Sequence, residues 1–267
     1  DELLRIQKLE VALYILYKNI FLKIDYLLFN FINKFIMDVP TLVDNGINCF
    51  YPEINGEISF MCYYPNFLEH EDRETIIKWL SIQEYKEGKC ISGKEIPRLQ
   101  LWYQEKNKYF CEVWKYRYDR WKSNNYDPIL KKIQDKVNLI TNKLIDEYCS
   151  TIYKPKINSC LINKYRNGND SIKPHRDTPD SFGDYPTICG VSFGDTRKLV
   201  FKKIDFDKKN YNSMKTDRQS EMDFEIELED NSLFIMGGAS QKYYSHQIPK
   251  SDSIKQRYSL TFREFIY

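Results

Sequence analysis

Apolar side chains recur at helical spacing along residues 128–148, which makes this segment the clearest element of the chain. The series steps by three or four residues, the repeat that keeps side chains on one face of an α-helix. Its members are Ile129, Ile133, Val137, Ile140, Leu144 and Tyr148. Asp127 and Pro128 stand where a helix favours a capping residue and a first-turn proline. The pattern therefore predicts one long amphipathic helix.

Two segments nearer the N-terminus also have helical spacing. Residues 71–83 predict a second helix, with its apolar positions on one face. Residues 6–37 predict one or two more, so residues 1–55 are expected to form a helical N-terminal extension. We expect this extension to pack on the domain, and the alternative is a helix that lies on a membrane surface. Its longest unbroken apolar run, Val11 to Tyr17, is too short to span a bilayer, and no stable membrane insertion is expected.

After Thr151 the pattern changes to short β-type runs separated by turn residues. They lie at 160–165, 188–193, 199–203, 224–228, 233–236, 243–246 and 257–263. Several short strands at roughly ten-residue spacing are typical of an antiparallel sandwich or barrel. The expected fold class is α+β, with helices that cover one face of a sheet.

Composition narrows the class of protein and its compartment. In 267 residues, 40 Lys and Arg stand against 38 Asp and Glu, so a net charge of +2 gives no overall attraction to nucleic acid. The seven cysteines are widely spaced and include no CxxC pair, unlike a disulfide framework or a thiolate zinc site. Without a signal-peptide pattern, we expect an intracellular protein of a reducing compartment, in the nucleus or the cytoplasm. Abundant Lys, Asn, Ile and Tyr indicate an AT-rich genome, such as that of a protist or a large virus.

Of the three histidines, two have a context that suits chemistry. His70 stands among acidic residues before a predicted helix and is expected to be solvated. His175 and Asp177 lie two residues apart on a predicted extended segment, so their side chains point to the same side. With His246, at the end of another β-type run, they supply the two imidazoles and one carboxylate of the facial triad of non-haem Fe(II) oxygenases. Such a triad leaves coordination positions for a co-substrate and O2.

The predicted strand at 257–263 carries an arginine at each end, on the same face. Buried guanidinium groups need anionic partners. A dicarboxylate such as 2-oxoglutarate would offer Arg257 and Arg263 one carboxylate each. For Arg263 a protein carboxylate is the alternative partner, and Asp177 is the candidate.

These residues belong to a longer set of motifs: Asn163-Lys164-Tyr165-Arg166-Asn167-Gly168, His175-Arg176-Asp177, Val191-Ser192-Phe193-Gly194, Gly237-Gly238 with His246, and Arg257 to Arg263. In this order they resemble the AlkB family and look most like its eukaryotic DNA and RNA demethylating homologues. The resemblance covers residues 96–267 and implies a double-stranded β-helix, or jelly roll, with helices packed on one sheet. It implies a dioxygenase domain at 56–267, with a nucleotide-recognition part at about 96–127 and a catalytic jelly roll at about 151–267.

The resemblance also implies a role for individual side chains. The ligands of Fe(II) would be His175, Asp177 and His246. Asn163 and Arg263 would address the end of 2-oxoglutarate that chelates the metal, and Tyr165 and Arg257 would hold the distal carboxylate. The reaction implied is oxidative removal of an N-methyl group, with O2 as the second co-substrate and formaldehyde, succinate and CO2 as products.

The chain departs from the family pattern at two places. Homologues usually carry Asn two residues after the first arginine, where this chain has Ser259. Many also place acidic residues directly after the metal-binding aspartate, where this chain has Thr178 and Pro179. The first departure concerns one co-substrate contact, and the second concerns the preference for a base.

A local basic segment suits contact with nucleic acid. Residues 98–132 contain nine Lys and Arg against four Asp and Glu, interleaved with Trp, Tyr and Phe. Basic side chains contact phosphates and aromatic rings stack on bases. The candidates are Tyr116 and Tyr118 for stacking on a flipped base, Arg98 for contact with the strand, and Asp180 as a carboxylate near a cationic base. The alternative is a hairpin with a solvated basic face.

We therefore predict a monomeric enzyme that demethylates N-alkylated bases, N1-methyladenine and N3-methylcytosine, in DNA or RNA. Its cofactor would be Fe(II) and its co-substrates 2-oxoglutarate and O2. One alternative keeps the oxygenase chemistry and replaces the substrate by a protein or a small molecule. Another is a nucleic-acid-binding module without catalytic activity.

Overall fold

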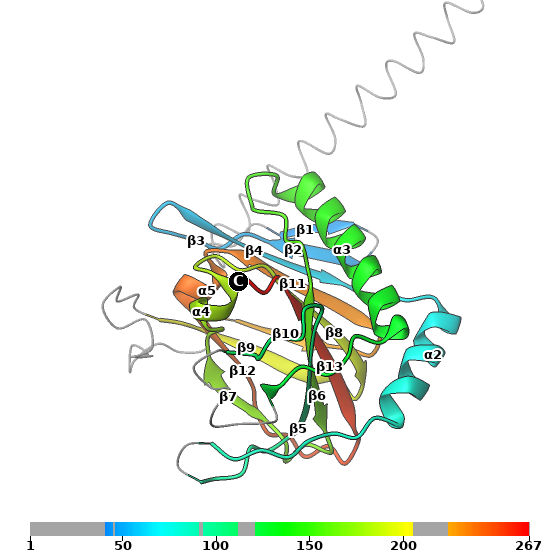
Figure 1. Cartoon of the computed structure of the whole chain (residues 1–267). Coiled ribbons are helices and arrows are strands. Elements are labelled where there is room, and N and C mark those ends of the chain that lie inside the picture. The colour runs from blue at the N-terminus through cyan, green and yellow to red at the C-terminus, as the bar shows by residue number, and fades with distance from the viewer. Residues whose placement is uncertain (1–40, 45, 91–92, 112–120, 205–223, 267) are drawn as a thin grey trace, which may run out of the picture. The chain divides into compact units, whose positions relative to one another are not determined.

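The computed structural model describes residues 41–44, 46–90, 93–111, 121–204 and 224–266. Within them the chain forms two mostly antiparallel sheets with few helices, and Leu42–Tyr267 make one compact unit (Figure 1). The helices predicted between residues 6 and 37 lie outside the described residues. Among the helices that are described, none has the length and apolar character needed to cross a membrane.

The larger sheet is built from strands at both ends of the described chain. They are β1 (Thr41–Asp44), β2 (Ile47–Phe50), β3 (Glu53–Ile54), β4 (Glu57–Tyr64), β5 (Leu99–Gln104), β6 (Ser159–Tyr165), β8 (Ile188–Gly194), β11 (Ser232–Gly238) and β13 (Arg257–Arg263). Their order in space is β1-β2-β4-β11-β8-β13-β6-β5, with β3 paired to β4. The neighbours β4 and β11 are far apart in sequence, so the sheet joins the first and last parts of the domain.

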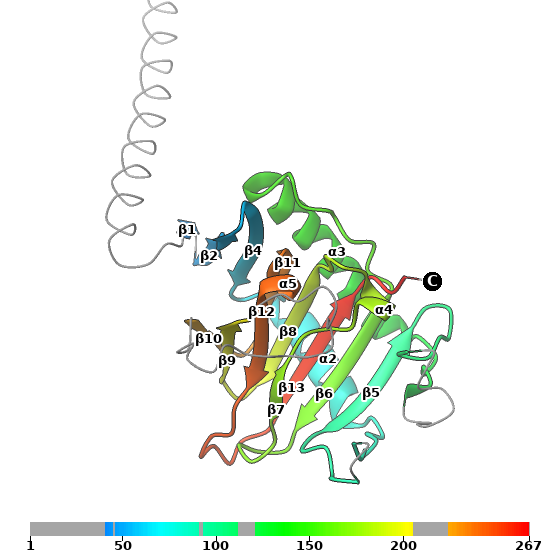
Figure 2. The same ribbon diagram turned by 90° about the vertical axis from the view of Figure 1, so that its left-hand side faces the viewer.

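A smaller sheet faces part of the larger one (Figure 2). It contains β7 (Ile172–His175), β9 (Arg197–Lys203), β10 (Phe224–Leu228) and β12 (Tyr244–Ile248), in the order β10-β9-β12-β7. Phe201, Phe234 and Tyr165 belong to an apolar cluster that fills part of the space between the sheets. Two facing sheets with these crossovers are the predicted jelly roll.

Two helices cover the outer face of the larger sheet, α2 (His70–Ser81) and α3 (Pro128–Tyr148) (Figure 1). Ile133, Val137 and Leu144 of α3 are buried against the sheet, as the helical spacing predicted. The side chain of Asp127 accepts a hydrogen bond from the backbone N–H of Ile129 at 2.7 Å, which confirms the predicted cap. Two single-turn helices, α4 (Pro179–Phe182) and α5 (Ser240–Tyr243), lie beside the sheets.

Strand β13 is buried on both faces. Apolar and polar side chains alternate along it, so one face is apolar and the other is polar. Its apolar side chains pack into the core beneath the helices: Tyr258, Leu260 and Phe262. Its polar side chains line the space between the sheets: Arg257, Ser259, Thr261 and Arg263. Because side chains alternate along a strand, one short sequence supplies both a core and a polar wall.

The expected extension over residues 1–55 needs a correction at its end. Residues 41–44, 47–50 and 53–54 form strands rather than helix, and the compact unit begins at Leu42. The reason is the pairing of β2 with β4, which buries Cys49 completely within the sheet. The seven predicted strand positions from residue 160 onward all coincide with observed strands, although Tyr243 ends α5 instead of beginning β12.

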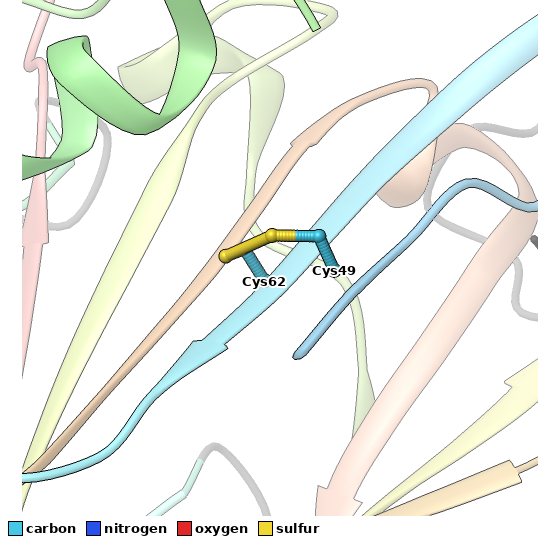
Figure 3. Close-up of a disulfide and its surroundings, with 2 residues drawn as sticks. All are labelled: Cys49 and Cys62. Atoms are coloured by element: carbon cyan, nitrogen blue, oxygen red, sulfur yellow. A yellow bond between two sulfur atoms is a disulfide. The ribbon is translucent and has the colours of Figure 1, made fainter. Parts of the chain in front are cut away.

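Cys49 and Cys62 form a disulfide between β2 and β4 (Figure 3). The two residues are direct partners in the antiparallel ladder, with their Cα atoms 4.1 Å apart. The spacing of the cysteines predicted no disulfide framework, and this pair corrects that expectation. The pairing depends on the register of β2 against β4, which cysteine spacing cannot reveal. The other described cysteines are thiols: Cys90, Cys111, Cys149, Cys160 and Cys189.

The cap of α3 gives the first prediction. Asp127→Ala should lower the free energy of unfolding by about 1 kcal/mol, because the Ile129 N–H loses its acceptor. Asp127→Asn keeps an acceptor oxygen and should stay close to the wild type. Urea denaturation of the three proteins measures the difference, and equal stabilities of the Ala and Asn variants would contradict the capping role.

Candidate active site

The smaller sheet brings His175 and His246 together. They lie on the neighbouring strands β7 and β12, where they are direct partners in the ladder. Their ring centroids are 4.3 Å apart. Asp177 follows two residues after His175, and one ligand atom from each of the three side chains lies within 4.8 Å of the others. The predicted triad is therefore assembled, and within the described residues it is the one such group that could hold a metal ion.

The surroundings of the triad suit a metal ion. The Nδ1 atom of His175 is within hydrogen-bonding distance of the Lys173 carbonyl oxygen, at 2.9 Å, which leaves Nε2 for a metal. The Nδ1 atom of His246 is buried without a partner among the described residues. The Oδ2 atom of Asp177 accepts a hydrogen bond from Nε of Arg263, so Oδ1 remains for coordination. These donors fit Fe(II).

Burial also puts the triad in the protonation state that binds metals. It lowers the pKa of His246 to about 3 and, against the opposing effect of Asp177, lowers the pKa of His175. Burial opposes ionisation of Asp177, but the Arg263 guanidinium and the two imidazoles hold the pKa of this carboxyl below its usual value. At neutral pH the site therefore presents two neutral imidazoles and one carboxylate, and no proton must be displaced when a cation binds.

A cavity of about 330 Å³ extends from the triad into the space between the two sheets. Arg257 lies in its wall, 1% exposed, and its Nη2 donates a hydrogen bond to Oγ of Ser192 at 2.8 Å. Its Nε and Nη1 are buried with no partner among the described residues. Burial lowers the pKa of Arg257, which opposes its charge. Two unused donors on a buried guanidinium fit a carboxylate in the cavity.

Tyr165 lies opposite Arg257 in the β6–β13 ladder. The Arg257 guanidinium carbon is 5.2 Å from the centre of the Tyr165 ring, within cation–π range. The ring holds the guanidinium in place, and Tyr165 also lines the cavity. The two residues predicted to hold the distal carboxylate of 2-oxoglutarate are thus neighbours.

Arg263 pairs with a protein carboxylate, the alternative partner that the sequence analysis considered. Its Nε pairs with Asp177, and both side chains are only 5% exposed. The guanidinium also lies over the Phe182 ring, 5.0 Å from its centre. Arg263 lines the cavity next to the triad, at the opposite end of β13 from Arg257. A contact with the chelating end of a co-substrate stays a prediction.

The amide of Asn163 has a defined orientation. Its Oδ1 accepts hydrogen bonds from Nε of Arg98, at 2.9 Å, and from Nε2 of Gln100, at 3.0 Å. Because both donors occupy the oxygen, the Nδ2 amide group is the end left for a ligand in the cavity. The predicted contact of Arg98 with the nucleic-acid strand stays a prediction, and its Nη1 donates to the Ser171 carbonyl oxygen at 3.2 Å. Its described contacts support alignment of Asn163.

Within the described part of the chain, none of the other substrate candidates is found beside the triad. Tyr116 and Tyr118 lie outside them. Asp180 is exposed in the first turn of α4 and is not part of the cavity wall. Sequence reasoning assigned no role to Ser192 or Gln100. The alternation of β8 could have identified Ser192, since Cys189, Val191 and Phe193 face the core and the positions between them face the cavity.

One comparison identifies the family, and another concerns the fold. The family model described as "2OG-Fe(II) oxygenase superfamily" matches residues 60–263, most of the chain. The chain belongs to this superfamily, and its cofactor is Fe(II) with 2-oxoglutarate and O2 as co-substrates. Among solved structures, OsALKBH1 superposes with a TM-score of 0.51 at 16% identity and covers 76% of this chain and 97% of that one. This likeness concerns the fold.

Within the superfamily, the chain is AlkB-like. It is 28% identical over 211 residues to human alpha-ketoglutarate-dependent dioxygenase alkB homolog 3, with 77% of this chain and 66% of the relative covered. It is 29% identical over 140 residues to bovine DNA oxidative demethylase ALKBH2, with 52% and 44% covered. The chain thus spans just under two thirds of the first relative, and the similarity to both confirms the resemblance found in the motifs.

The orientation of Asn163 gives the second prediction. Arg98→Gln should raise KM for 2-oxoglutarate about 10-fold, because loss of a charge-assisted hydrogen bond of about 1.5 kcal/mol frees the Asn163 amide. KM for an oligonucleotide substrate should change much less. Steady-state kinetics with each substrate varied in turn provide the test. A larger rise in KM for the oligonucleotide than for 2-oxoglutarate would instead support the predicted contact of Arg98 with the strand.

Proposed function

We propose that this protein demethylates N-alkylated bases in DNA or RNA, with N1-methyladenine and N3-methylcytosine as its substrates. The observation that carries the proposal is one cavity that holds the His-Asp-His triad and, along the same strand, Arg257 and Arg263. A metal ion and an extended dicarboxylate can occupy such a cavity together. Similarity to alkB homolog 3 and ALKBH2 supports a methylated nucleic acid as substrate. The intact site argues against a catalytically inactive binding module.

The chain itself would bind and orient the reactants. His175, Asp177 and His246 would hold Fe(II), and Arg263 would keep the Asp177 carboxylate turned toward the metal. Arg257, with Tyr165 against its guanidinium, would anchor the distal carboxylate of 2-oxoglutarate. Asn163 would donate from Nδ2 to the other end. Two fixed ends would leave the dicarboxylate one orientation, which sets the open coordination position that faces the substrate.

With these groups bound, the metal centre supplies the oxidising power to hydroxylate an N-methyl group. The overall reaction would place one oxygen atom of O2 in succinate, with loss of CO2 from 2-oxoglutarate, and the other in the hydroxyl of an N-hydroxymethyl base. That base would lose formaldehyde and a proton, which returns the ring nitrogen to the neutral form, with a free lone pair, that it has in unmodified adenine or cytosine. Apolar walls, including Leu161, Ile188 and Met236, keep bulk water away from the reacting groups.

The aromatic lining supports a flat substrate. Phe110 and Trp121 line the cavity, with ring centroids 4.7 Å apart. They flank residues 112–120, which contain Tyr116 and Tyr118. Aromatic rings in the wall of a cavity suit stacking against an extruded base, and a methylated base that cannot pair is extruded at low cost. Monomeric state and intracellular location stay predictions.

The third prediction tests the activity directly. The iron-loaded enzyme should release formaldehyde from oligonucleotides that carry N1-methyladenine or N3-methylcytosine, with equimolar succinate. Asp177→Ala should lose this activity because a ligand of the metal is gone. His70→Ala should keep it, since His70 is exposed on α2 and lies outside the cavity. Turnover of a peptide or a small molecule, with none on any methylated DNA or RNA, would keep the oxygenase chemistry and reject the nucleic-acid substrate.

The fourth prediction concerns the distal carboxylate. Arg257→Lys should raise KM for 2-oxoglutarate by about 10-fold or more, because an ammonium group cannot reproduce the two donors of a guanidinium fork. Arg73→Lys, at a partly exposed ion pair with Asp230, is the matched control and should leave KM unchanged. An Arg257→Lys enzyme whose KM rises equally for the oligonucleotide would contradict a specific role toward 2-oxoglutarate.

A further inference from the structure

A buried glutamine connects the two segments that carry the metal ligands. Gln241 lies in α5, between β11 and β12, and is 1% exposed. Its Oε1 accepts a hydrogen bond from the backbone N–H of Asp177 at 2.9 Å. Asp177 is 64 residues away in sequence, so the contact is purely tertiary.

The position of Asp177 explains why this contact matters. Strand β7 ends at His175, so the backbone of Asp177 lies beyond the ladder that fixes the first histidine. The side chain of Asp177 is held by Arg263 and its backbone by Gln241. These two attachments together define where the carboxylate points. Without the hydrogen bond to Gln241, the main chain at Asp177 could rotate about the side-chain contact with Arg263.

Gln241 is also placed with respect to the third ligand. Residue 241 precedes His246 by five positions, and α5 leads directly into β12. The start of α5 is anchored by the backbone N–H of Ala239, which donates to the Ile58 carbonyl oxygen at 3.0 Å. Gly238, at φ +59°, allows this approach, because a Cβ there would overlap the same oxygen. Gln241 thus connects the backbone of Asp177 to the start of the segment that carries His246.

The contact of the Gln241 amide nitrogen shows which hydrogen bond sets the orientation of this side chain. Nε2 of Gln241 donates to Sδ of Met236 at 3.4 Å, and a thioether is a weak acceptor. The strong hydrogen bond is therefore the one to Asp177. An apolar residue of similar size would satisfy the Met236 side and leave the buried Asp177 N–H unpaired, at the cost of its desolvation.

We propose that Gln241 is a positioning residue of the metal centre: it fixes the backbone of Asp177 so that the carboxylate and both imidazoles are arranged before the metal binds. The proposal rests on the ligand roles assigned to the triad and adds a residue outside it. Removal of a group that hydrogen-bonds to a metal ligand and orients it typically lowers metal affinity by about 10- to 100-fold.

The fifth prediction measures metal affinity without turnover. Mn(II) is titrated into metal-free full-length protein, and the free ion is counted by electron paramagnetic resonance. Gln241→Leu should raise Kd for Mn(II) by about 10- to 100-fold. Gln241→Glu retains an acceptor oxygen at the same reach and should bind close to the wild type. If the Leu variant does not fold, Gln241→Met, with a side chain of equal length, makes the same comparison.

Two controls separate positioning from stability. Gln134→Leu removes another buried glutamine, which bonds to Tyr126 and Glu105 away from the triad. It should lower Tm and leave Kd unchanged. Asp177→Ala gives the affinity of a protein without the carboxylate. A folded Gln241→Leu protein with wild-type Kd would overturn the proposal. Equal binding by the wild type and Asp177→Ala would instead show that the triad is not the metal site, and the proposal would fall with it.

Discussion

The buried ion pair between Arg263 and Asp177 is the interaction on which the site depends. Arg263 ends β13 in the larger sheet, and Asp177 follows β7 of the smaller one, so the pair joins the two sheets in the wall of the cavity. Both side chains are 5% exposed. Each charge makes the burial of the other tolerable, and removal of one leaves an uncompensated charge in the interior. The metal site and the closure of the jelly roll therefore share one interaction.

The central strands are buried on both faces, and one of these faces supplies the other residues of the site. Strands β6, β8 and β13 pack apolar side chains under α2 and α3 with every second residue and line the cavity with the others. The polar residues of one strand stand opposite those of the next, as Tyr165 does with Arg257. A slip of one residue in register would exchange the two faces, so the packing of the helices fixes the chemistry of the cavity.

Local pattern was enough to predict α2, α3 and seven of the strands, and to select the three candidate metal ligands that the structure brings together. The α3 helix, its Asp127 cap and the strand from Arg257 to Arg263 follow from spacing, and the triad follows from a scarce residue type. Contacts that arise only from tertiary pairing could not be predicted. The Cys49–Cys62 bridge depends on strand register, and the contact of Arg98 with Asn163 depends on the β5–β6 ladder. Gln241 lies between Gly238 and His246, yet nothing in the neighbouring sequence shows that it reaches Asp177.

The unpaired donors of Arg257 make the fold itself sensitive to its ligand. Nε and Nη1 are buried without partners among the described residues, which destabilises the folded chain relative to one whose donors are satisfied. A bound dicarboxylate pairs them only in the folded state, and mass action then adds to stability as its concentration rises above Kd. In a cell, the fraction of this protein that survives proteolysis would rise and fall with the concentration of that dicarboxylate, even when no second substrate is present.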